Sequence, residues 1–218
     1  MQKNIEIVGA RITLDVPEAG TDTCLLFIPG ASGGARTGRF APLVTVALEK
    51  GYAIARIDMW ENADVLNTLT LNRVLAVLKD AVSVLQKEGF ERIILVGKSM
   101  GGGIVLIFEH PAVVQKIAWA PAFASADIGN VRDILDTPYS SLERSQDIKI
   151  GKAELHAISV PVGIIHGTAD TTIPIENSHD IIAALSQGML IEIAGADHSF
   201  KTPNEERELM EATRGLLQ

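Results

Sequence analysis

Short, mostly apolar runs recur along the chain and alternate with longer segments of helical spacing. Runs of this length are typical of strands buried on both faces, as in a parallel sheet. They occupy residues 25–28, 52–57, 92–96, 116–119, 162–165 and 190–193. Two earlier segments, 5–8 and 11–16, read as extended, and the second alternates between apolar and polar side chains. This half-polar pattern predicts an antiparallel hairpin at an edge of the sheet.

The segments between these runs carry the spacing of helices. Apolar residues from Leu66 to Leu85 recur at intervals of three and four, which predicts one amphipathic helix ending near Gly89. Residues 103–108, 175–186 and 204–217 are further predicted helices. Strands that alternate with helices predict a doubly wound α/β domain with right-handed crossovers. We therefore expect a single α/β domain over 1–218, with eight strands of which the first two are antiparallel.

The connection over residues 121–159 interrupts this alternation. It is longer than an ordinary connection and lacks a sustained apolar period. Long connections of this kind are usually functional. We predict an irregular excursion near the candidate functional site, with short helices near 131–135 and 152–156.

The sequence Gly97-Lys98-Ser99-Met100-Gly101 follows one predicted strand and precedes a predicted helix. This is the arrangement of a nucleophile elbow, in which a strained turn lifts the serine hydroxyl clear of the sheet. Glycine is needed on both sides because larger side chains would collide with neighbouring backbone. A glycine-rich turn that holds a serine by chance is the alternative interpretation. The strand before Ser99 and the helix after it favour the elbow, with the backbone N–H of Met100 as an oxyanion donor.

A second loop of small residues, 29–36, follows the first buried strand. Small residues let backbone N–H groups approach a ligand closely, so we predict the N–H of Ala31 as the second oxyanion donor. A phosphate-binding loop is less favoured because no Gly-Lys-Ser/Thr ending is present. Arg36 and Arg39 could face an anionic substrate group, but solvated charges at a helix start are the favoured interpretation.

A nucleophilic serine needs a base, and a histidine base needs an acid to orient it. His198 follows the last predicted strand and Asp170 follows the strand before it. The carboxyl ends of parallel strands meet at one sheet edge, so we predict a triad of Ser99, Asp170 and His198. His166 is predicted to make a structural hydrogen bond at its strand end. Asp197 is interpreted as a loop-stabilising residue.

Composition narrows the setting of this chemistry. The formal net charge is −8, which disfavours nucleic acid and anionic membranes as partners. The single cysteine, Cys24, lies in an apolar run and is predicted to be a buried core thiol. The N-terminus lacks the apolar region of a signal peptide, and no apolar run is long enough to span a bilayer. We expect a soluble cytoplasmic protein.

With these motifs in place, the chain resembles the α/β-hydrolase superfamily from about residue 24 to the C-terminus. It is similar to small esterases and to dienelactone-hydrolase-like members with little or no cap. The resemblance implies hydrolysis of a carboxylic ester or related acyl bond, without a metal or cofactor. Two positions depart from the pattern. Pro29-Gly30 stands where many relatives have His-Gly, and Ser99 stands where dienelactone hydrolases proper use a cysteine nucleophile.

The predicted function is therefore a serine hydrolase that acts on a small-molecule acyl substrate through an acyl-enzyme intermediate. Amide, peptide and thioester hydrolysis use the same groups and remain alternatives. A ligand-binding module that keeps the fold without turnover is the alternative from another class. Dehalogenase and epoxide hydrolase chemistry is disfavoured because both need a carboxylate where Ser99 stands. The oligomeric state is left open.

Overall fold

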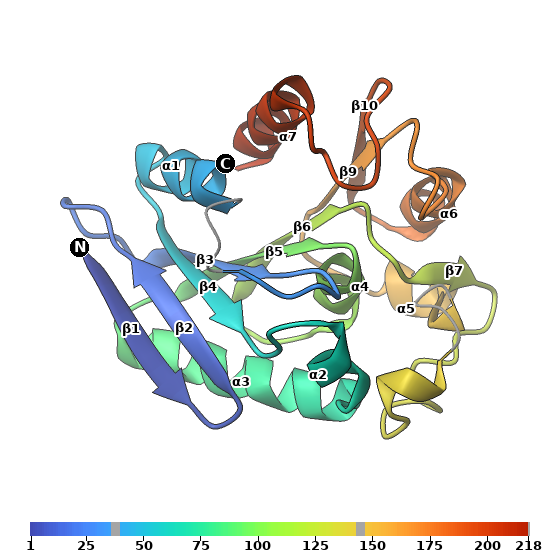
Figure 1. Ribbon diagram of the computed structural model, residues 1–218, viewed down its shortest axis with the longest axis horizontal. Helices are drawn as coiled ribbons and strands as arrows, with labels where there is room; N and C mark the ends of the chain where they lie inside the picture. The colour runs from blue at the N-terminus through green and yellow to red at the C-terminus, as the bar shows by residue number, and fades with distance from the viewer. Residues whose placement is uncertain (36–39, 143–146, 218) are drawn as a thin grey trace.

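The computed structural model describes residues 1–35, 40–142 and 147–217. Its centre is one eight-stranded sheet in the order β1-β2-β4-β3-β5-β6-β9-β10 (Figure 1). β1 and β2 form an antiparallel hairpin, β2 pairs antiparallel with β4, and every other pairing is parallel. The predicted mostly parallel eight-stranded sheet with an N-terminal hairpin is confirmed. The strands are β1 Gln2–Ile7, β2 Ala10–Asp15, β3 Thr23–Ile28, β4 Ala53–Asp58, β5 Arg92–Lys98, β6 Val113–Trp119, β9 Val162–Gly167 and β10 Gly188–Ile193.

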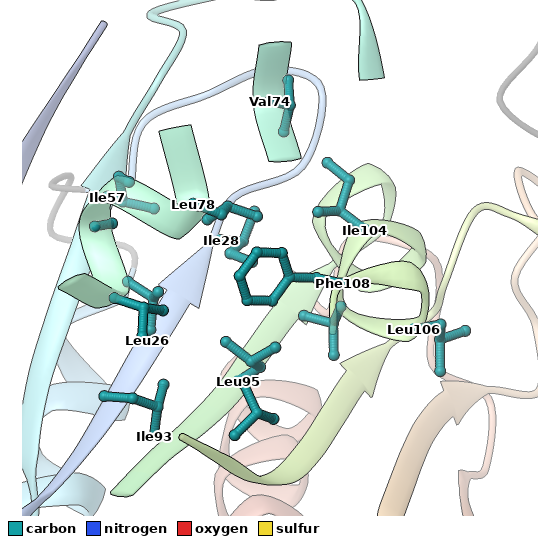
Figure 2. Close-up of a cluster of buried hydrophobic side chains, with 14 of the residues drawn as sticks. Leu26, Ile28, Ile57, Val74, Leu78, Ile93, Leu95, Ile104, Leu106 and Phe108 are labelled. Carbon is teal, nitrogen blue, oxygen red and sulfur yellow. The ribbon is translucent and has the colours of Figure 1, made fainter. Parts of the chain in front are cut away.

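Helices cover both faces of this sheet (Figure 1). Successive side chains of a strand point to opposite faces, so each inner strand needs two apolar layers. Leu26 and Ile28 of β3 pack with α3 and α4, as Figure 2 shows, and Leu25 and Phe27 pack with α1 and α7. The helices are α1 Ala41–Glu49, α2 Ala63–Asn67, α3 Leu71–Lys87, α4 Met100–Ile107, α5 Lys152–His156, α6 Glu176–Ala184 and α7 Pro203–Leu216.

The helix predicted to run on from Leu66 is two helices, so that prediction was wrong in its first part. Asn62 caps α2, because its side chain accepts a hydrogen bond from the N–H of Val65. Thr70 caps α3 in the same way, by accepting from the N–H of Arg73. The cap residue has extended backbone, which ends the helical geometry between the two helices. The predicted end of α3 near Gly89 is confirmed.

The excursion over 121–159 contains a small parallel sheet that the sequence pattern did not predict. β7 (Ala124–Ala126) pairs with β8 (Lys149–Gly151), and a 3₁₀ turn covers Tyr139–Ser141. The short helix predicted near 152–156 is α5, but residues 131–135 form turns and not a helix. Asn130 explains the difference, because its side-chain amide bonds the backbone of Asp147 and Lys149. These bonds hold the start of the turn against β8, and residues 131–135 do not continue as a helix.

The excursion is anchored on the α2–α3 corner. The N–H of Asn72 donates to Leu135 O, and the N–H of Tyr139 donates to Leu69 O. Thr137, Tyr139 and Leu142 also line, with Met100, a void too narrow to admit water. The excursion therefore reaches the first residue of α4.

Parallel pairing brings the carboxyl ends of β3, β5, β9 and β10 to one edge of the sheet. The loops that follow these strands carry the predicted site residues. Cys24 is fully buried in β3, as predicted, and burial raises the pKa of its thiol. Across the described residues, no helix has the length and apolar character needed to cross a membrane.

Candidate active site

Ser99 lies in the sharp turn between β5 and α4, with a positive φ of 53°. The turn brings the backbone of its two flanking glycines against other chain segments. A Cβ on Gly97 would lie 2.3 Å from Gly101 O, and a Cβ on Gly101 would lie 2.3 Å from Ile28 O. Real Cβ atoms do not approach so closely. The predicted elbow geometry is therefore confirmed, and both glycines are required by packing.

Three backbone hydrogen bonds hold the strained residue in place. The N–H of Ser99 donates to Trp119 O at 2.8 Å, and its carbonyl accepts from Gly103 N and Ala122 N, both at 3.0 Å. A non-glycine residue in the left-handed region persists only where neighbouring structure holds it. Here β6 and the chain that follows it supply that support.

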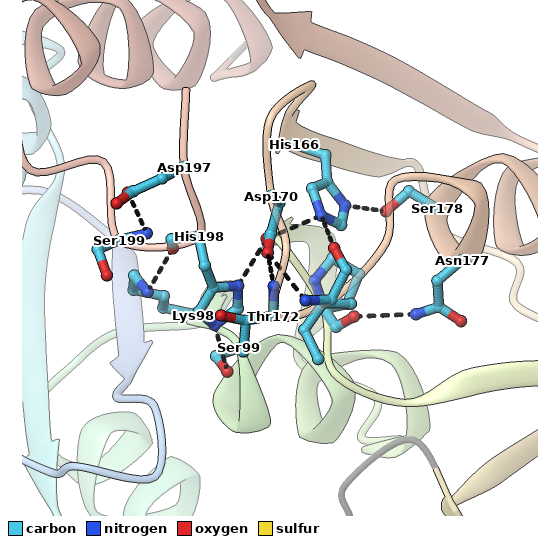
Figure 3. A network of polar contacts seen from close by, with 12 residues as sticks. Lys98, Ser99, His166, Asp170, Thr172, Asn177, Ser178, Asp197, His198 and Ser199 are labelled. Atoms are coloured by element: carbon cyan, nitrogen blue, oxygen red, sulfur yellow. Dashed lines mark hydrogen bonds and ion pairs between the residues drawn. The ribbon is translucent and has the colours of Figure 1, made fainter. Parts of the chain in front are cut away.

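The structure brings the three predicted side chains into one hydrogen-bonded row (Figure 3). Ser99 Oγ lies 2.9 Å from His198 Nε2, and His198 Nδ1 lies 2.6 Å from Asp170 Oδ2. An ionised carboxylate only accepts hydrogen bonds, so Nδ1 carries the ring proton and Nε2 accepts from the Ser99 hydroxyl. The Asp170 side chain is fully buried and the His198 side chain is 14% exposed. This arrangement can remove a proton from Ser99 while the buried carboxylate stabilises the resulting imidazolium.

The loop after β9 supplies the donors that keep Asp170 ionised. Its Oδ1 accepts from the N–H groups of Thr172 and Ile173, both at 2.8 Å. Burial on its own would raise the pKa of the Asp170 carboxyl. Hydrogen bonds from His166, His198 and the Ile173 N–H more than offset burial and hold that pKa well below its usual range.

His166 forms the structural hydrogen bonds predicted for it, and one of them reaches the acid itself. The ring is fully buried at the end of β9. Its Nε2 lies 3.1 Å from Asp170 Oδ2 and 3.0 Å from Ile173 O, and its Nδ1 lies 2.6 Å from Ser178 Oγ. Both partners of Nε2 are acceptors, so Nε2 carries a proton. No pattern in the sequence indicates the contact between His166 and Asp170.

The loop that carries His198 is a tight turn. Asp197 Oδ1 accepts from the N–H of Ser199 at 2.6 Å, which confirms the predicted loop-stabilising role. Phe200 has a positive φ of 48°, an unusual conformation for a bulky side chain. Lys98 Nζ donates to the backbone carbonyl of His198 at 3.0 Å. The contact of Lys98 was not predicted, because no spacing rule links this residue to one 100 positions later.

The loop of small residues lies beside Ser99, as predicted. Trp60 Nε1 donates to Gly30 O at 2.9 Å and fixes the start of the loop. Asp58, the last residue of β4, accepts from the N–H of Ala35 at 2.9 Å. Arg36 and Arg39, considered above as possible anion contacts, lie outside the described residues.

These loops enclose a pocket of about 490 Å³ at the row of side chains. Ala31, Glu61, Lys98, Ser99 and His198 are among its lining residues. Met100 begins α4, and the first N–H groups of a helix have no partner within the helix. Among the described residues, no group of three or more His, Cys, Asp or Glu side chains is placed to hold a metal ion.

A model of the dienelactone hydrolase family matches residues 49–215. Among curated protein sequences, none matches the chain.

Solved structures extend the comparison at the level of the fold. Est1E from Butyrivibrio proteoclasticus, solved with ferulic acid bound, is 20% identical with a TM-score of 0.77, over 98% of this chain and 96% of that one. A monoacylglycerol lipase from Paleococcus ferrophilus is 18% identical with a TM-score of 0.71, over 94% and 96%. Mouse alpha/beta hydrolase domain-containing protein 10 is 19% identical with a TM-score of 0.70, over 100% and 98%. Likeness at these identities establishes the fold alone, and the predicted α/β-hydrolase fold is confirmed.

Proposed function

The chain belongs to the dienelactone hydrolase family, and from this premise we propose that it hydrolyses carboxylic esters through an acyl-enzyme intermediate on Ser99. Membership confirms the resemblance inferred from the motifs and identifies the chain as a hydrolase. The observation that carries the proposal is the row of hydrogen bonds from Ser99 through His198 to Asp170. The structurally similar protein described as a monoacylglycerol lipase supports an ester as the substrate class.

The first half of the reaction forms the acyl-enzyme. Ser99 Oγ attacks the acyl carbon while its proton passes to His198 Nε2, and Asp170 stabilises the imidazolium. The carbonyl oxygen becomes an oxyanion, for which we assign the N–H groups of Met100 and Ala31 as donors. The tetrahedral intermediate then collapses. The bond to the leaving alkoxide breaks, and that oxygen takes the proton from Nε2 and departs as the alcohol.

The second half releases the acid. A water molecule attacks the acyl carbon and gives its proton to His198 Nε2. The bond between the acyl carbon and Ser99 Oγ breaks, and Oγ recovers the proton from the imidazolium. The chain returns to its starting protonation state, and one ester and one water have become one acid and one alcohol.

The test is hydrolysis of p-nitrophenyl butyrate by the wild-type chain and by Ser99→Ala. We expect kcat/KM to fall by about 10⁴- to 10⁶-fold in Ser99→Ala, and a fluorophosphonate to label the wild type only. The exposed Ser83→Ala of α3 is the matched control and should keep full activity. Wild-type activity in Ser99→Ala, or tight binding of the ester without turnover or labelling, contradicts the proposal. A p-nitroanilide or a thioester turned over faster than the matched ester also contradicts it.

A further inference from the structure

The side chain of Lys98 joins the elbow to the loop of the base. Lys98 is the last residue of β5 and directly precedes Ser99, and its residue surface is only 8% exposed. Its Nζ donates to the backbone carbonyl of His198 at 3.0 Å (Figure 3). Adjacent residues of the elbow therefore bind the same histidine twice, Lys98 at the main chain and Ser99 at the ring.

The loop over 194–202 that carries His198, called the base loop below, is bonded to the loop after β9 and has a further anchor on β5. Phe200, two residues after His198, has a left-handed backbone conformation with a φ of 48°. Such strain persists only where other contacts hold it. The hydrogen bond from Ser199 N to the Asp197 carboxylate lies within the turn and cannot fix the turn relative to Ser99. The bond from Lys98 does fix it, because it comes from a strand in the middle of the sheet.

The bond from Lys98 matters because the base loop follows a strand at the edge of the sheet. The loop follows β10, which is an edge strand, whereas Ser99 follows β5, which lies between β3 and β6. Asp170 holds the His198 ring at Nδ1, but Asp170 lies on the loop after the neighbouring strand β9 and not on β5. The bond from Lys98 adds a contact from β5 to the main chain of His198, beside the bond between the ring and Ser99.

We infer that Lys98 is a positioning residue, whose ammonium group holds the His198 main chain on the elbow and so keeps Nε2 within reach of Ser99 Oγ. This inference rests on the proposed ester hydrolysis. The competing role for a cation in this pocket is recognition of an anionic substrate group. Glu61 lines the same pocket, and its carboxylate would oppose an anionic ligand there. Lys98 Nζ donates a hydrogen bond to the main chain of the base loop, and this contact favours the positioning role.

The test compares Lys98→Met, Lys98→Arg and Lys201→Met by steady-state kinetics on p-nitrophenyl butyrate. Methionine keeps the length of the apolar stem and removes the donor. Lys201 is an exposed lysine on the same loop, so Lys201→Met changes the net charge equally. We expect Lys98→Met to lower kcat by about 10- to 100-fold with KM changed by less than about two-fold, because small misplacement of a catalytic group is costly. Lys98→Arg keeps a cationic donor, so its kcat should be at least about five-fold higher than that of Lys98→Met. Lys201→Met should match the wild type.

A second measurement separates positioning from a loss of fold. The rate at which a fluorophosphonate labels Ser99 should fall in parallel with kcat, while the thermal midpoint of Lys98→Met stays close to that of the wild type. Should Lys98→Met not fold, Lys98→Gln takes its place with the same expected loss, because its amide is one bond shorter than the lysine side chain.

Three outcomes overturn the inference. Wild-type kcat in the donor-free variant shows that the bond does not position the base. An unchanged kcat with a raised KM, confined to a p-nitrophenyl glutarate that carries a free carboxylate, shows that Lys98 is a substrate-binding cation. A wild-type chain that neither hydrolyses the ester nor reacts with the fluorophosphonate contradicts the proposed function itself, and the inference falls with it. The first two results leave the proposed function standing.

Discussion

His166 and Asp170 stand four residues apart and share a hydrogen bond, 3.1 Å from Nε2 to Oδ2, in which both side chains are fully buried. The same oxygen of Asp170 accepts from His198 at 2.6 Å. The acid of the site is therefore held between two imidazoles, one facing Ser99 and one facing the core. This relationship makes the loop after β9 sensitive to changes on its inner side.

Removing the inner imidazole tests that sensitivity. His166→Ala leaves Ser178 Oγ and Ile173 O without this partner in a closed site. We expect the free energy of unfolding to fall by about 2–4 kcal/mol, because buried polar groups that lose their partners are costly. His179→Ala is the control, since His179 pairs with Glu192 where both side chains are about half exposed. Urea unfolding should show a change below about 0.5 kcal/mol for the control. Equal effects in the two variants would contradict the buried network.

The low pKa of Asp170 predicts how its contribution to stability depends on pH. A carboxyl whose pKa is lower folded than unfolded stabilises the fold above its unfolded value, about 3.9. That contribution is lost as pH falls from about 4 toward the lower folded value. The difference in unfolding free energy between wild type and Asp170→Asn should therefore be full at pH 7 and clearly smaller at pH 3. Urea unfolding at both values measures it.

Asp80→Asn, on the exposed side of α3, is the matched control for this pH series. It should stay within about 0.5 kcal/mol of the wild type at both pH values. A gap between wild type and Asp170→Asn that is as large at pH 3 as at pH 7 would show that the carboxylate charge is not the cause.

The space around two glycines, one in the elbow and one in α7, predicts opposite effects of their substitution by alanine. A Cβ on Gly101 would lie 2.3 Å from Ile28 O and 2.5 Å from Pro29 O. Backbone cannot yield so far, so Gly101→Ala should destabilise the fold by at least about 2 kcal/mol and lower kcat. Gly215 of α7 has nothing within 4 Å of its Cβ position, and Gly215→Ala should stabilise by about 0.5–1 kcal/mol. Thermal unfolding of both variants checks the pair, and a neutral Gly101→Ala would refute the elbow geometry.

Lys116 predicts a rise in stability at alkaline pH. Its ammonium is fully buried, 3.1 Å from Leu106 O and 2.5 Å from Glu109 Oε1. Burial lowers the pKa of Lys116, and the Glu109 carboxylate offsets only part of this effect. Lys116 thus releases its proton at lower pH in the folded chain than in the unfolded chain, where the pKa of a lysine is about 10.4. The free energy of unfolding therefore increases with pH between the two pKa values.

Lys116→Met should remove that increase. At pH 7 we expect the variant to lie within about 1 kcal/mol of the wild type, because a buried charge carries a large desolvation cost. Urea unfolding at pH 7 and pH 9.5 measures the slope, with Lys79→Met on the exposed side of α3 as the control. The prediction fails if Lys116→Met gains as much stability at pH 9.5 as the wild type does.

The elements and the elbow were predictable because their signals are local. Five of the six apolar runs mark strands buried along nearly their whole length, and the glycines around Ser99 mark a turn that admits no side chain. The prediction of burial on both faces was wrong for residues 190–193, because they lie in the edge strand β10, which is mostly exposed or half-buried. The meeting of Ser99, Asp170 and His198 at one place then follows from the parallel sheet, which collects strand ends at one edge. The roles assigned to Met100 and Ala31 stay predictions, since a backbone N–H leaves no mark in the sequence.

Other features depend on contacts that no local pattern records. Leu66 and Leu69 fit one helical period with α3, yet Thr70 ends that period because its side chain caps α3 and its backbone forms a bridge with Pro138. β7 and β8 have three residues each, too few to show a period. The bond from Lys98 to His198 joins residues 100 positions apart. Only the folded chain specifies it.

The order of strands in the sheet divides the site into two mechanical parts. The Ser99 hydroxyl lies at the start of α4, which is buried from Met100 to Leu106. The His198 imidazole lies on the loop after the edge strand β10. Warming should loosen the loop after β10 before it loosens β5 and α4. Hydrolytic activity would then be lost while most helices and strands are intact, and cooling would restore the activity without refolding of the whole chain.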